Sequence, residues 1–302
     1  MVDVLIRAGC FISIIILGYI LRKIKFFKEE DFTLLSKIVL RITLPAAIVT
    51  SFAGTEIAPA MLTLSLMGLG IGLVYIGLAF LLNRKKKKED KIFDVVNMSG
   101  YNIGAFTMPF VQRFLGPVGV ISTSLFDVGN AFVCLGGSHG IGIILKQGGK
   151  LSIKKIAKNL IKSIAFDTYI IMLLVNMANV RVPLPVLSLA EIVGNANAFL
   201  AMLMIGVGFK ISGDKKQIGK IVRILVIRYG IGLIFALSTF YLLKFPQEVK
   251  VALMILAFSP LPSSSPAYTD DLKGDVGLSS AVNSISIVCS IVLIVLLLLT
   301  ML

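Results

Sequence analysis

Residues 97–119 read NMSGYNIGAFTMPFVQRFLGPVG, an apolar stretch that is interrupted near its middle by Asn102, Gly104, Thr107 and Pro109. Hydrocarbon contains no water to bond freed backbone amides and carbonyls, so a bilayer tolerates such a break only where the backbone faces a polar cavity. We therefore expect a membrane helix that is broken at this point, with a binding site at the break.

The composition of the whole chain is that of a membrane protein. Of its 302 residues, 57% are hydrophobic and 15% are charged, and the mean hydropathy is +0.94, far above that of a soluble domain. The net charge of +14 does not indicate nucleic-acid binding, because the lysines lie in short loops between apolar runs rather than on a polar surface beside aromatic side chains. We expect a lipid bilayer around the chain and no nucleic-acid partner.

The positions of the cysteines and of the histidine indicate neither a metal site nor a disulfide. Cys10, Cys134 and Cys289 all fall within apolar runs, and His139 has no ligand residues at metal-binding spacing. The first apolar run is followed by basic residues and lacks a small-residue cleavage site, so we expect a retained helix rather than a signal peptide.

Residues 136–140, GGSHG, spell the G-x-S-x-G pattern of a nucleophile elbow. That motif needs a strand before the serine, a helix after it, and a separate acid and histidine. Here the pattern lies within an apolar helical run and His139 adjoins Ser138, so we expect no enzyme. Close helix packing explains the G-x-x-x-G spacing of Gly68 and Gly72, Gly100 and Gly104, and Gly136 and Gly140.

A spanning helix needs about 20 apolar residues, and the chain offers ten such runs. They are approximately residues 4–21, 34–53, 61–82, 92–112, 118–145, 161–179, 187–209, 219–243, 249–269 and 277–301. We therefore expect an all-α integral membrane protein of ten transmembrane helices.

Basic residues predict the orientation, since cytoplasmic loops carry an excess of Lys and Arg. Clusters follow the first, third, fifth and seventh runs, within residues 22–28, 84–91, 146–158 and 210–220. The loop after the second run holds no basic residue. The loops after the fourth and sixth runs hold one each, Arg113 and Arg181. Both termini are therefore expected outside, in a plasma membrane. The RKKKK run, residues 84–88, is expected to be a solvated loop, with anionic-lipid contact as the alternative.

Two halves of the chain repeat. Residues 116–122, GPVGVIS, match residues 274–280, GDVGLSS, and the offset of 158 carries the first five runs onto the last five. Because each half has an odd number of spans, the second half is inverted relative to the first, as in many secondary transporters.

The repeat demands a second break in the ninth run. That run contains FSPLPSSSP, residues 258–266, with three prolines and four serines. Each interior proline removes a helical hydrogen bond, although a tolerated kink is the simpler interpretation of any one of them. Matched broken helices in inverted halves indicate a transporter's binding site, and half-helix N-termini there would suit an anion.

Residues 100–130, GYNIGAFTMPFVQRFLGPVGVISTSLFDVGN, resemble the fourth and fifth spans of the auxin efflux carrier family. The likeness includes Asn102 seven residues before Pro109, the F-L-G turn and the D-x-G-N at residues 127–130, and it extends from Leu44-Pro45 to the proline-rich ninth run. The resemblance implies two inverted five-helix repeats with crossover helices four and nine, a fold shared with bile-acid sodium symporters. It also implies a scaffold of helices 1, 2, 6 and 7 and a moving core of helices 3–5 and 8–10.

The repeats are expected at residues 1–145 and 161–302, with a cytoplasmic linker at residues 146–160. The chain departs from the family pattern by lacking a proline near residues 202–204 and by carrying a serine cluster at residues 263–265. These departures leave the substrate open.

The substrate site is expected at the crossover. In the PIN-type carriers of the family the asparagine of the first crossover contacts the substrate carboxylate, a role that the resemblance carries onto Asn102. The candidate substrate-binding residues are Asn102, Tyr101, Thr107, Pro109, Ser259, Pro262, Ser263, Ser264, Ser265 and Pro266.

Acids within a membrane are costly to bury and are therefore functional candidates. Asp127, with Asn130 and Asn283, is a candidate for binding a coupling proton or sodium ion, and a structural hydrogen bond is the alternative. Arg228 either balances a buried acid or substrate or reaches toward the interface. Asp94 and Glu191 lie near span ends and are expected to be solvated.

The function predicted is secondary transport of a small organic anion, a carboxylate such as malate, malonate or an auxin-like acid, by elevator-like or rocking alternating access. The phosphate-binding G-x-x-x-x-G-K-[ST] motif does not occur, so we expect no ATP and no cofactor beyond coupling to H+ or Na+. The alternative is a membrane receptor or sensor that binds an organic anion in the same pocket. The scaffold helices are a candidate homodimer surface.

Overall fold

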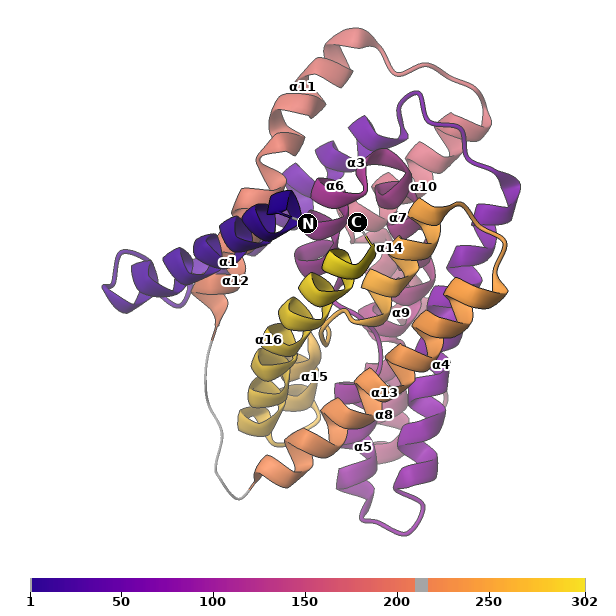
Figure 1. Ribbon diagram of the computed structural model, residues 1–302. Coiled ribbons are helices and arrows are strands. Elements are labelled where there is room, and N and C mark those ends of the chain that lie inside the picture. Colours follow the sequence, from indigo (N-terminus) through magenta and orange to yellow (C-terminus); the bar gives the residue numbers. More distant parts are fainter. Residues whose placement is uncertain (1, 210–216, 302) are drawn as a thin grey trace.

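The computed structural model describes residues 2–209 and 217–301, and every regular element in these two ranges is a helix (Figure 1). Lys210, Lys215 and Lys216, which the orientation argument counted among basic loop residues, lie outside the described residues. The expected all-α class is confirmed.

The first half of the chain forms five predicted spans, several of them built from more than one helix. They comprise α1 (Val2–Lys23); α2 (Asp31–Ile38), η1 (Val39–Thr43) and α3 (Leu44–Phe52); η2 (Pro59–Leu62) and α4 (Thr63–Leu82); α5 (Lys88–Met98), η3 (Ile103–Thr107) and α6 (Met108–Phe114); and α7 (Gly116–Phe132), η4 (Val133–Gly137) and α8 (Ser138–Gln147).

The second half begins with a helix that the sequence did not predict. The linker contains α9 (Ile153–Ile161), and the sixth predicted span is the short α10 (Ile164–Met177). The remaining elements are α11 (Leu184–Asn195) and α12 (Asn197–Gly208), α13 (Ile218–Leu242), α14 (Gln247–Ala257) and α15 (Ser265–Asp271), and α16 (Val276–Met301).

Seven helical segments of the described chain are long and apolar enough to cross a bilayer, and the bent pair α9–α10 raises the number to at most eight. The fourth and ninth predicted spans are absent from this set because each is divided into two shorter helices at the expected place. The two breaks are therefore confirmed, whereas the count of ten spans stays a prediction.

Two of the wide π-helical turns have a local cause. Both η1 and η3 end one residue before the dipeptides Leu44-Pro45 and Met108-Pro109. In a regular α-helix a proline ring clashes with the carbonyl four residues earlier, and in each case that carbonyl lies within the widened turn. The turn thus carries the helix past the proline.

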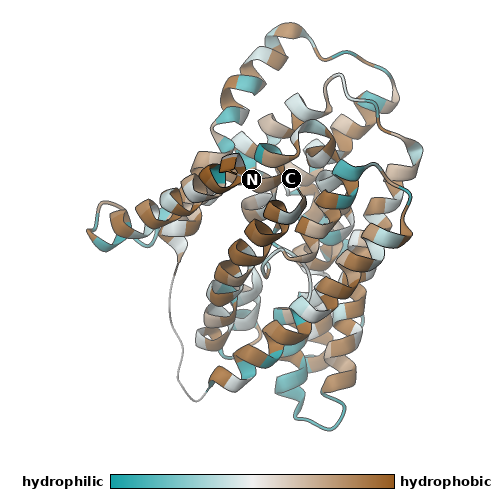
Figure 2. Cartoon of the chain, viewed as in Figure 1, coloured by the Kyte–Doolittle hydropathy of each residue, from teal (hydrophilic) through white to brown (hydrophobic). Residues whose placement is uncertain are grey.

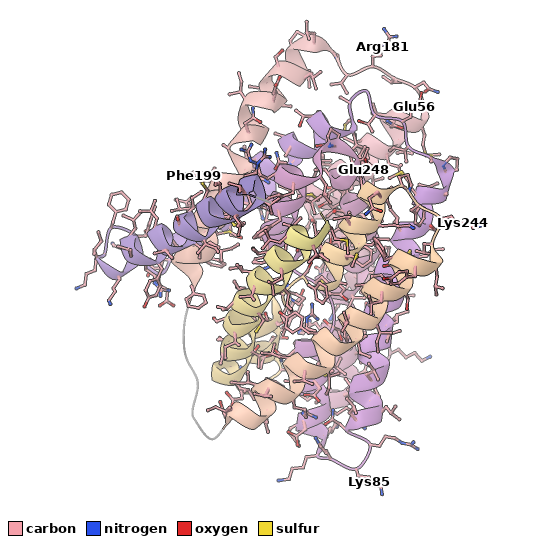
Figure 3. The ribbon with its side chains drawn as sticks, viewed as in Figure 1. Glu56, Lys85, Arg181, Phe199, Lys244 and Glu248 are labelled. Atoms are coloured by element: carbon pink, nitrogen blue, oxygen red, sulfur yellow. The ribbon has the colours of Figure 1, made fainter. Side chains whose placement is uncertain are left out.

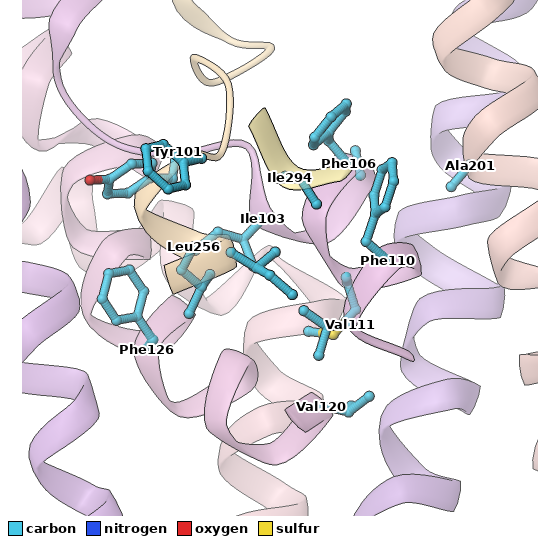
Figure 4. Packing of buried hydrophobic residues seen from close by; sticks show 14 of the residues in the cluster. Tyr101, Ile103, Phe106, Phe110, Val111, Val120, Phe126, Ala201, Leu256 and Ile294 are labelled. Atoms are coloured by element: carbon cyan, nitrogen blue, oxygen red, sulfur yellow. The ribbon is translucent and has the colours of Figure 1, made fainter. Parts of the chain in front are cut away.

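The helices pack in two groups. In one, α1 runs along α12, and α3 packs against α10 and α11 (Figure 1). In the other, α4 packs on α7, α5 on α8, α13 on α14, and α15 on α16. The apolar core includes residues that flank both breaks, among them Ile103, Phe106 and Phe110 from the first and Leu256 from the second (Figure 4).

Glycines permit the closest contacts within each group. A Cβ atom at Gly18 would meet the backbone of Leu203 and Gly206, and one at Gly68 would meet the carbonyl of Phe126. The predicted packing role of Gly68 and Gly72 is thus confirmed. Gly100 and Gly136 have a second role, because their φ angles of 79° and 154° interrupt their helices, and a Cβ at either would also approach a neighbouring element.

Charge is concentrated at the ends of the molecule. Hydrophilic residues gather in loops such as the one between α4 and α5, while the helix surfaces are mostly apolar (Figure 2). Lys85 lies at one end, and Glu56 and Arg181 lie toward the other (Figure 3). This sorting agrees with the alternation of loops expected from the sequence, and the side that faces the cytoplasm stays a prediction.

Candidate functional site

The break in the fourth span is an extended segment. Helix α5 ends at Met98, Ser99 has an extended conformation, and Gly100 has a φ of 79°, which glycine adopts readily. A side chain at Gly100 would also meet the sulfur of Cys134. The helix resumes at Ile103, which leaves residues 99–102 outside any helix.

The break in the ninth span lies against the first. Between Ala257 and Ser265 the chain is not helical, as the prolines require, since Pro260 and Pro262 carry no N–H to continue a helix. The backbone N–H of Asn102 donates to the carbonyl of Pro260 at 3.0 Å. The two broken spans therefore meet at their breaks, which is the geometry of a helix crossover.

Arg228 of α13 holds the crossing together. Its side chain is 0% exposed, and its guanidinium donates to the carbonyls of Met98 and Gly100, each at 2.7 Å, and of Ser259 and Pro260, each at 3.1 Å. These carbonyls lie at or just after the C-terminal ends of α5 and α14, where the helix dipoles are negative. One guanidinium thus satisfies free carbonyls from both halves of the chain.

Two tyrosines cover the same guanidinium. It lies 5.3 Å from the ring centre of Tyr75 and 4.6 Å from that of Tyr101, and the Tyr75 hydroxyl donates to the carbonyl of Arg228. Of the two roles considered for Arg228, reaching the interface is wrong, because the side chain is buried. Its acceptors among the described residues are backbone carbonyls, so it pairs with no acid in that part of the chain.

Asn130 of α7 also binds the extended segment of the first break, residues 99–102. Its side-chain amide donates to the carbonyl of Tyr101 at 3.0 Å and accepts from the N–H of Tyr101 at 2.9 Å. It also donates to Asp127 at 2.8 Å, and the second oxygen of Asp127 accepts from the hydroxyl of Tyr169 on α10 at 3.1 Å. Two of the coupling candidates therefore act as a pair, and Asp127 joins α7 to a helix of the other group.

Several predicted site residues are occupied by contacts within the protein. The hydroxyls of Thr107 and Ser259 bond each other at 2.6 Å, and Ser265 donates to the carbonyl of Val96 at 3.1 Å. Pro109 is buried in α6. None of these four lines either of the two cavities described next.

Two cavities adjoin the crossing. The larger, of about 720 Å3, is lined by residues from α1, α2, α12, α15 and α16, and it includes Asn102, Ser263, Pro266 and Asn283. The smaller, of about 270 Å3, is bounded by η1, α7, η4 and α10, and it includes Tyr101, Asn102, Asp127, Asn130, Pro262, Ser263 and Ser264. The structure thus brings six of the ten predicted substrate residues to a cavity and divides the coupling candidates between the two.

Asn102 occupies the position common to both cavities. Its backbone is engaged with Pro260 and Thr107, but its side-chain amide makes no hydrogen bond within the described part of the chain. Ser263 lines the same two cavities. In the larger cavity the buried Oδ1 of Asn283 likewise has no partner among the described residues.

A buried polar cluster near the crossing was missed by the sequence interpretation. The Asn97 side chain donates to Thr269 at 3.0 Å and accepts from Ser279 at 2.5 Å, which links α5 to α15 and α16. Single polar residues in three separate spans gave no signal of this proximity.

Asp94 was also misplaced. Its side chain is 1% exposed, and both oxygens accept from Arg223 of α13, at 2.7 and 2.8 Å. The expectation of a solvated position was wrong because the partner lies in a span distant in sequence. Glu191 is exposed, as expected.

The family comparison covers the first crossover. A family model described as Membrane transport protein matches residues 10–180, more than half of the chain. The chain belongs to this family. Its relation to the auxin efflux carriers, inferred from residues 100–130, is thereby confirmed. A second model, the Sodium Bile acid symporter family, matches residues 197–302, which include the second break.

These matches establish a multi-pass membrane transporter of the auxin efflux carrier family. No curated protein matches the chain. The described residues include no group of His, Cys, Asp and Glu side chains able to hold a metal ion. His139 contacts Asp271 at 2.7 Å and stacks on Tyr268, but Ser138 begins α8 without a preceding strand, so the G-x-S-x-G segment is not a nucleophile elbow.

Proposed function

We propose that the protein is a secondary transporter of a small organic anion, a carboxylate such as malate, malonate or an auxin-like acid, and that Asn102 binds the carboxylate. The observation that carries the proposal is the unpartnered amide of Asn102 beside two cavities. The amide faces both cavities without a hydrogen-bond partner among the described residues. A carboxylate oxygen accepting from it would form a charge-assisted hydrogen bond, which is stronger than a bond between neutral groups.

The electrostatics of the crossing favour an anion. The guanidinium of Arg228 is bonded to backbone carbonyls and to no acid among the described residues, so it adds net positive charge near the crossing. The helical segment of η3 and α6 begins at Ile103, directly after Asn102, and the N-terminal end of a helix attracts negative charge. Both effects are strengthened where water is scarce.

Coupling is proposed at Asp127 and Asn130. Their hydrogen-bonded pair borders the smaller cavity, where a proton or sodium ion would neutralise the carboxylate. Asn283, which borders the larger cavity, is the corresponding candidate of the second half. Binding of the cation and the anion on opposite sides of one crossover would couple their movements.

The movement proposed is elevator-like. The group containing both crossovers would carry the substrate as a core, while α1, α2, α3, α10, α11 and α12 would form the scaffold. The larger cavity separates residues of α1, α2 and α12 from residues of α15 and α16, and it reaches Arg22, Glu29 and Glu30. With those residues on the expected cytoplasmic side of a plasma membrane, this is an inward-facing state.

The experiment is uptake into proteoliposomes of radiolabelled malate, malonate and indole-3-acetate, each with and without a sodium or proton gradient. We expect uptake of at least one acid above that of empty liposomes. The Asn102→Ala variant should lose it, because no other side chain provides the same amide between the cavities.

Asn195→Ala is the matched control, since Asn195 is exposed at the end of α11 and borders neither cavity. Its uptake should equal that of the unaltered protein. Unchanged uptake by Asn102→Ala would refute the site, and failure of all three acids to enter would refute the proposed substrate class.

A further inference from the structure

Helix α9 lies almost at right angles to its neighbour. The pair α9–α10 is bent by 79°, and each member has its own N-terminal cap, Ser152 for α9 and Ser163 for α10. Because α10 is one of the predicted spans, a helix at this angle to it runs along the membrane surface rather than through the bilayer.

The faces of α9 separate into three. Leu160, 5% exposed, and the half-buried Ile156 face the protein. Ile153 and Ile161 are 75% and 71% exposed and lie two turns apart on one side. Lys154, Lys158 and Lys162 follow at four-residue spacing and form an exposed row beside these isoleucines; the three are called the lysine row.

The helix is fixed to the transmembrane part. The side-chain amide of Asn159 donates to the carbonyl of Leu135 at 2.7 Å. Leu135 lies within η4, where the regular helix of the fifth span is interrupted. Gly136 leaves room for α9, since a Cβ there would approach Ile156 and Asn159. The exposed isoleucines are therefore held in place on the outside of the molecule.

We propose that α9 is an interfacial helix whose isoleucines enter the acyl region of the bilayer and whose lysine row binds the headgroups of anionic phospholipids. Apolar side chains on one face and lysines along its border are the features that seat a helix in the interface. Lysine stems reach outward from such a position and place their ammonium groups at the phosphates.

A cavity beside α9 provides further room for a headgroup. It has a volume of about 330 Å3 and is lined by Lys150, Lys155 and Lys158 together with the N-cap Ser152. Asp271, the one acidic residue lining it, is bonded to His139. The charge of this side of α9 is thus complementary to phosphate, and the whole surface fits an anionic bilayer.

The first experiment measures how deeply each side of α9 enters the bilayer. The chain contains no tryptophan, so Ile161→Trp introduces a single tryptophan on the isoleucine side of α9, and Lys158→Trp introduces one in the lysine row as the control. In vesicles, the tryptophan at position 161 should be quenched by phosphatidylcholine brominated near the headgroup end of its acyl chains and shielded from aqueous iodide. The one at position 158 should show the reverse. Equal iodide quenching at both positions would overturn the proposal.

The second experiment measures lipid preference with the Ile161→Trp protein in mixed phosphatidylcholine and phosphatidylglycerol vesicles. At low ionic strength, quenching by brominated phosphatidylglycerol should exceed quenching by brominated phosphatidylcholine at least about twofold, since each surface lysine attracts anionic lipid. The excess should disappear in Lys154→Gln/Lys158→Gln/Lys162→Gln and persist in Lys85→Gln/Lys86→Gln/Lys87→Gln.

Retained quenching by brominated phosphatidylcholine shows that α9 remains seated in the triple variant. An excess that survives loss of the lysine row, or that never appears in the unaltered lysine background, would refute the lipid contact.

Discussion

Arg228 shows how a single charge is accommodated inside a membrane protein without an acid. Its guanidinium replaces lost water with carbonyl oxygens from two breaks and with the faces of two tyrosines. Arginine suits this task because its donors form a rigid planar fork, whereas lysine presents a compact point charge on a flexible stem. The residue therefore positions the backbone of the site.

We predict that Arg228→Lys destabilises the protein by about 2–3 kcal/mol, because at least one of its charged hydrogen bonds is lost and carbonyls are left without donors. The measurement is the thermal midpoint in detergent. Arg181→Lys, an exchange at an exposed position, is the control and should leave the midpoint unchanged. Equal thermal midpoints for the two variants would mean that the contact between the two breaks does not depend on the planar guanidinium of Arg228.

Asp127 offers a test of coupling. The Asp127→Asn side chain has nearly the same size and still reaches Asn130 and Tyr169, but it carries no charge to be neutralised by a cation. Uptake should then no longer respond to an imposed proton or sodium gradient, while substrate exchange between the two sides continues. Tyr169→Phe, which removes only the hydrogen bond to Asp127, should keep the gradient response. A gradient response that persists in Asp127→Asn would assign the carboxylate a structural role.

Residues that border the cavities were predictable where a single local pattern pointed to them. The interruption of an apolar run identified Asn102, and the cost of an intramembrane acid identified Asp127. The partners of Arg228 were not predictable, since they lie at positions 98, 100, 259 and 260. The same holds for the pairing of Asp94 with Arg223.

At the scale of elements, the breaks followed from prolines and glycine, whose backbone limits are local and independent of packing. The widened turn of η1 did not, because Leu44-Pro45 alone is compatible with a kink or an ordinary helix start. Helix α9 was missed for a different reason. Its nine residues are too short to register as a span, and its lysines made the segment look like a loop.

Helix α4 permits a sharp test of close packing, because two of its glycines, Gly68 and Gly70, have different surroundings. Gly68→Ala should destabilise the protein by about 1–3 kcal/mol, since its new methyl group meets the carbonyl of Phe126 on α7. Gly70→Ala meets nothing within 4 Å and should be neutral or stabilising by up to about 1 kcal/mol through helix propensity. Thermal unfolding of both variants decides the point, and the reverse order would contradict the packing of α4 on α7.

At the scale of the whole molecule, the two helix groups share an apolar core, and polar contacts also cross between them. Gln112 of α6 accepts from Asn197 of α12 at 3.2 Å and donates to the carbonyl of Gly194 at 3.3 Å. Asn197 in turn accepts from Thr43 at 3.0 Å, a contact within the proposed scaffold. The neighbouring pairs Gln112–Asn197 and Thr43–Asn197 therefore distinguish movement between groups from movement within one.

We predict that joining the groups stops transport. In a background with Cys10, Cys134 and Cys289 replaced by serine, Gln112→Cys/Asn197→Cys treated with a short thiol-specific cross-linker should lose uptake, because the core could no longer slide. Thr43→Cys/Asn197→Cys, cross-linked in the same way, should retain it. Electrophoretic mobility reports cross-linking, and uptake by the cross-linked Gln112→Cys/Asn197→Cys protein would contradict an elevator.

The guanidinium at the crossing also constrains how the protein is made. Arg228 is synthesised long after Met98 and Gly100, so the fourth span enters the membrane before the group that donates hydrogen bonds to these two carbonyls exists. Until α13 is inserted, the extended segment of the first break has carbonyls without donors while it lies in hydrocarbon or in the insertion machinery. The ribosome thus delivers the two halves in sequence, but the first becomes a stable structure only when the second reaches it.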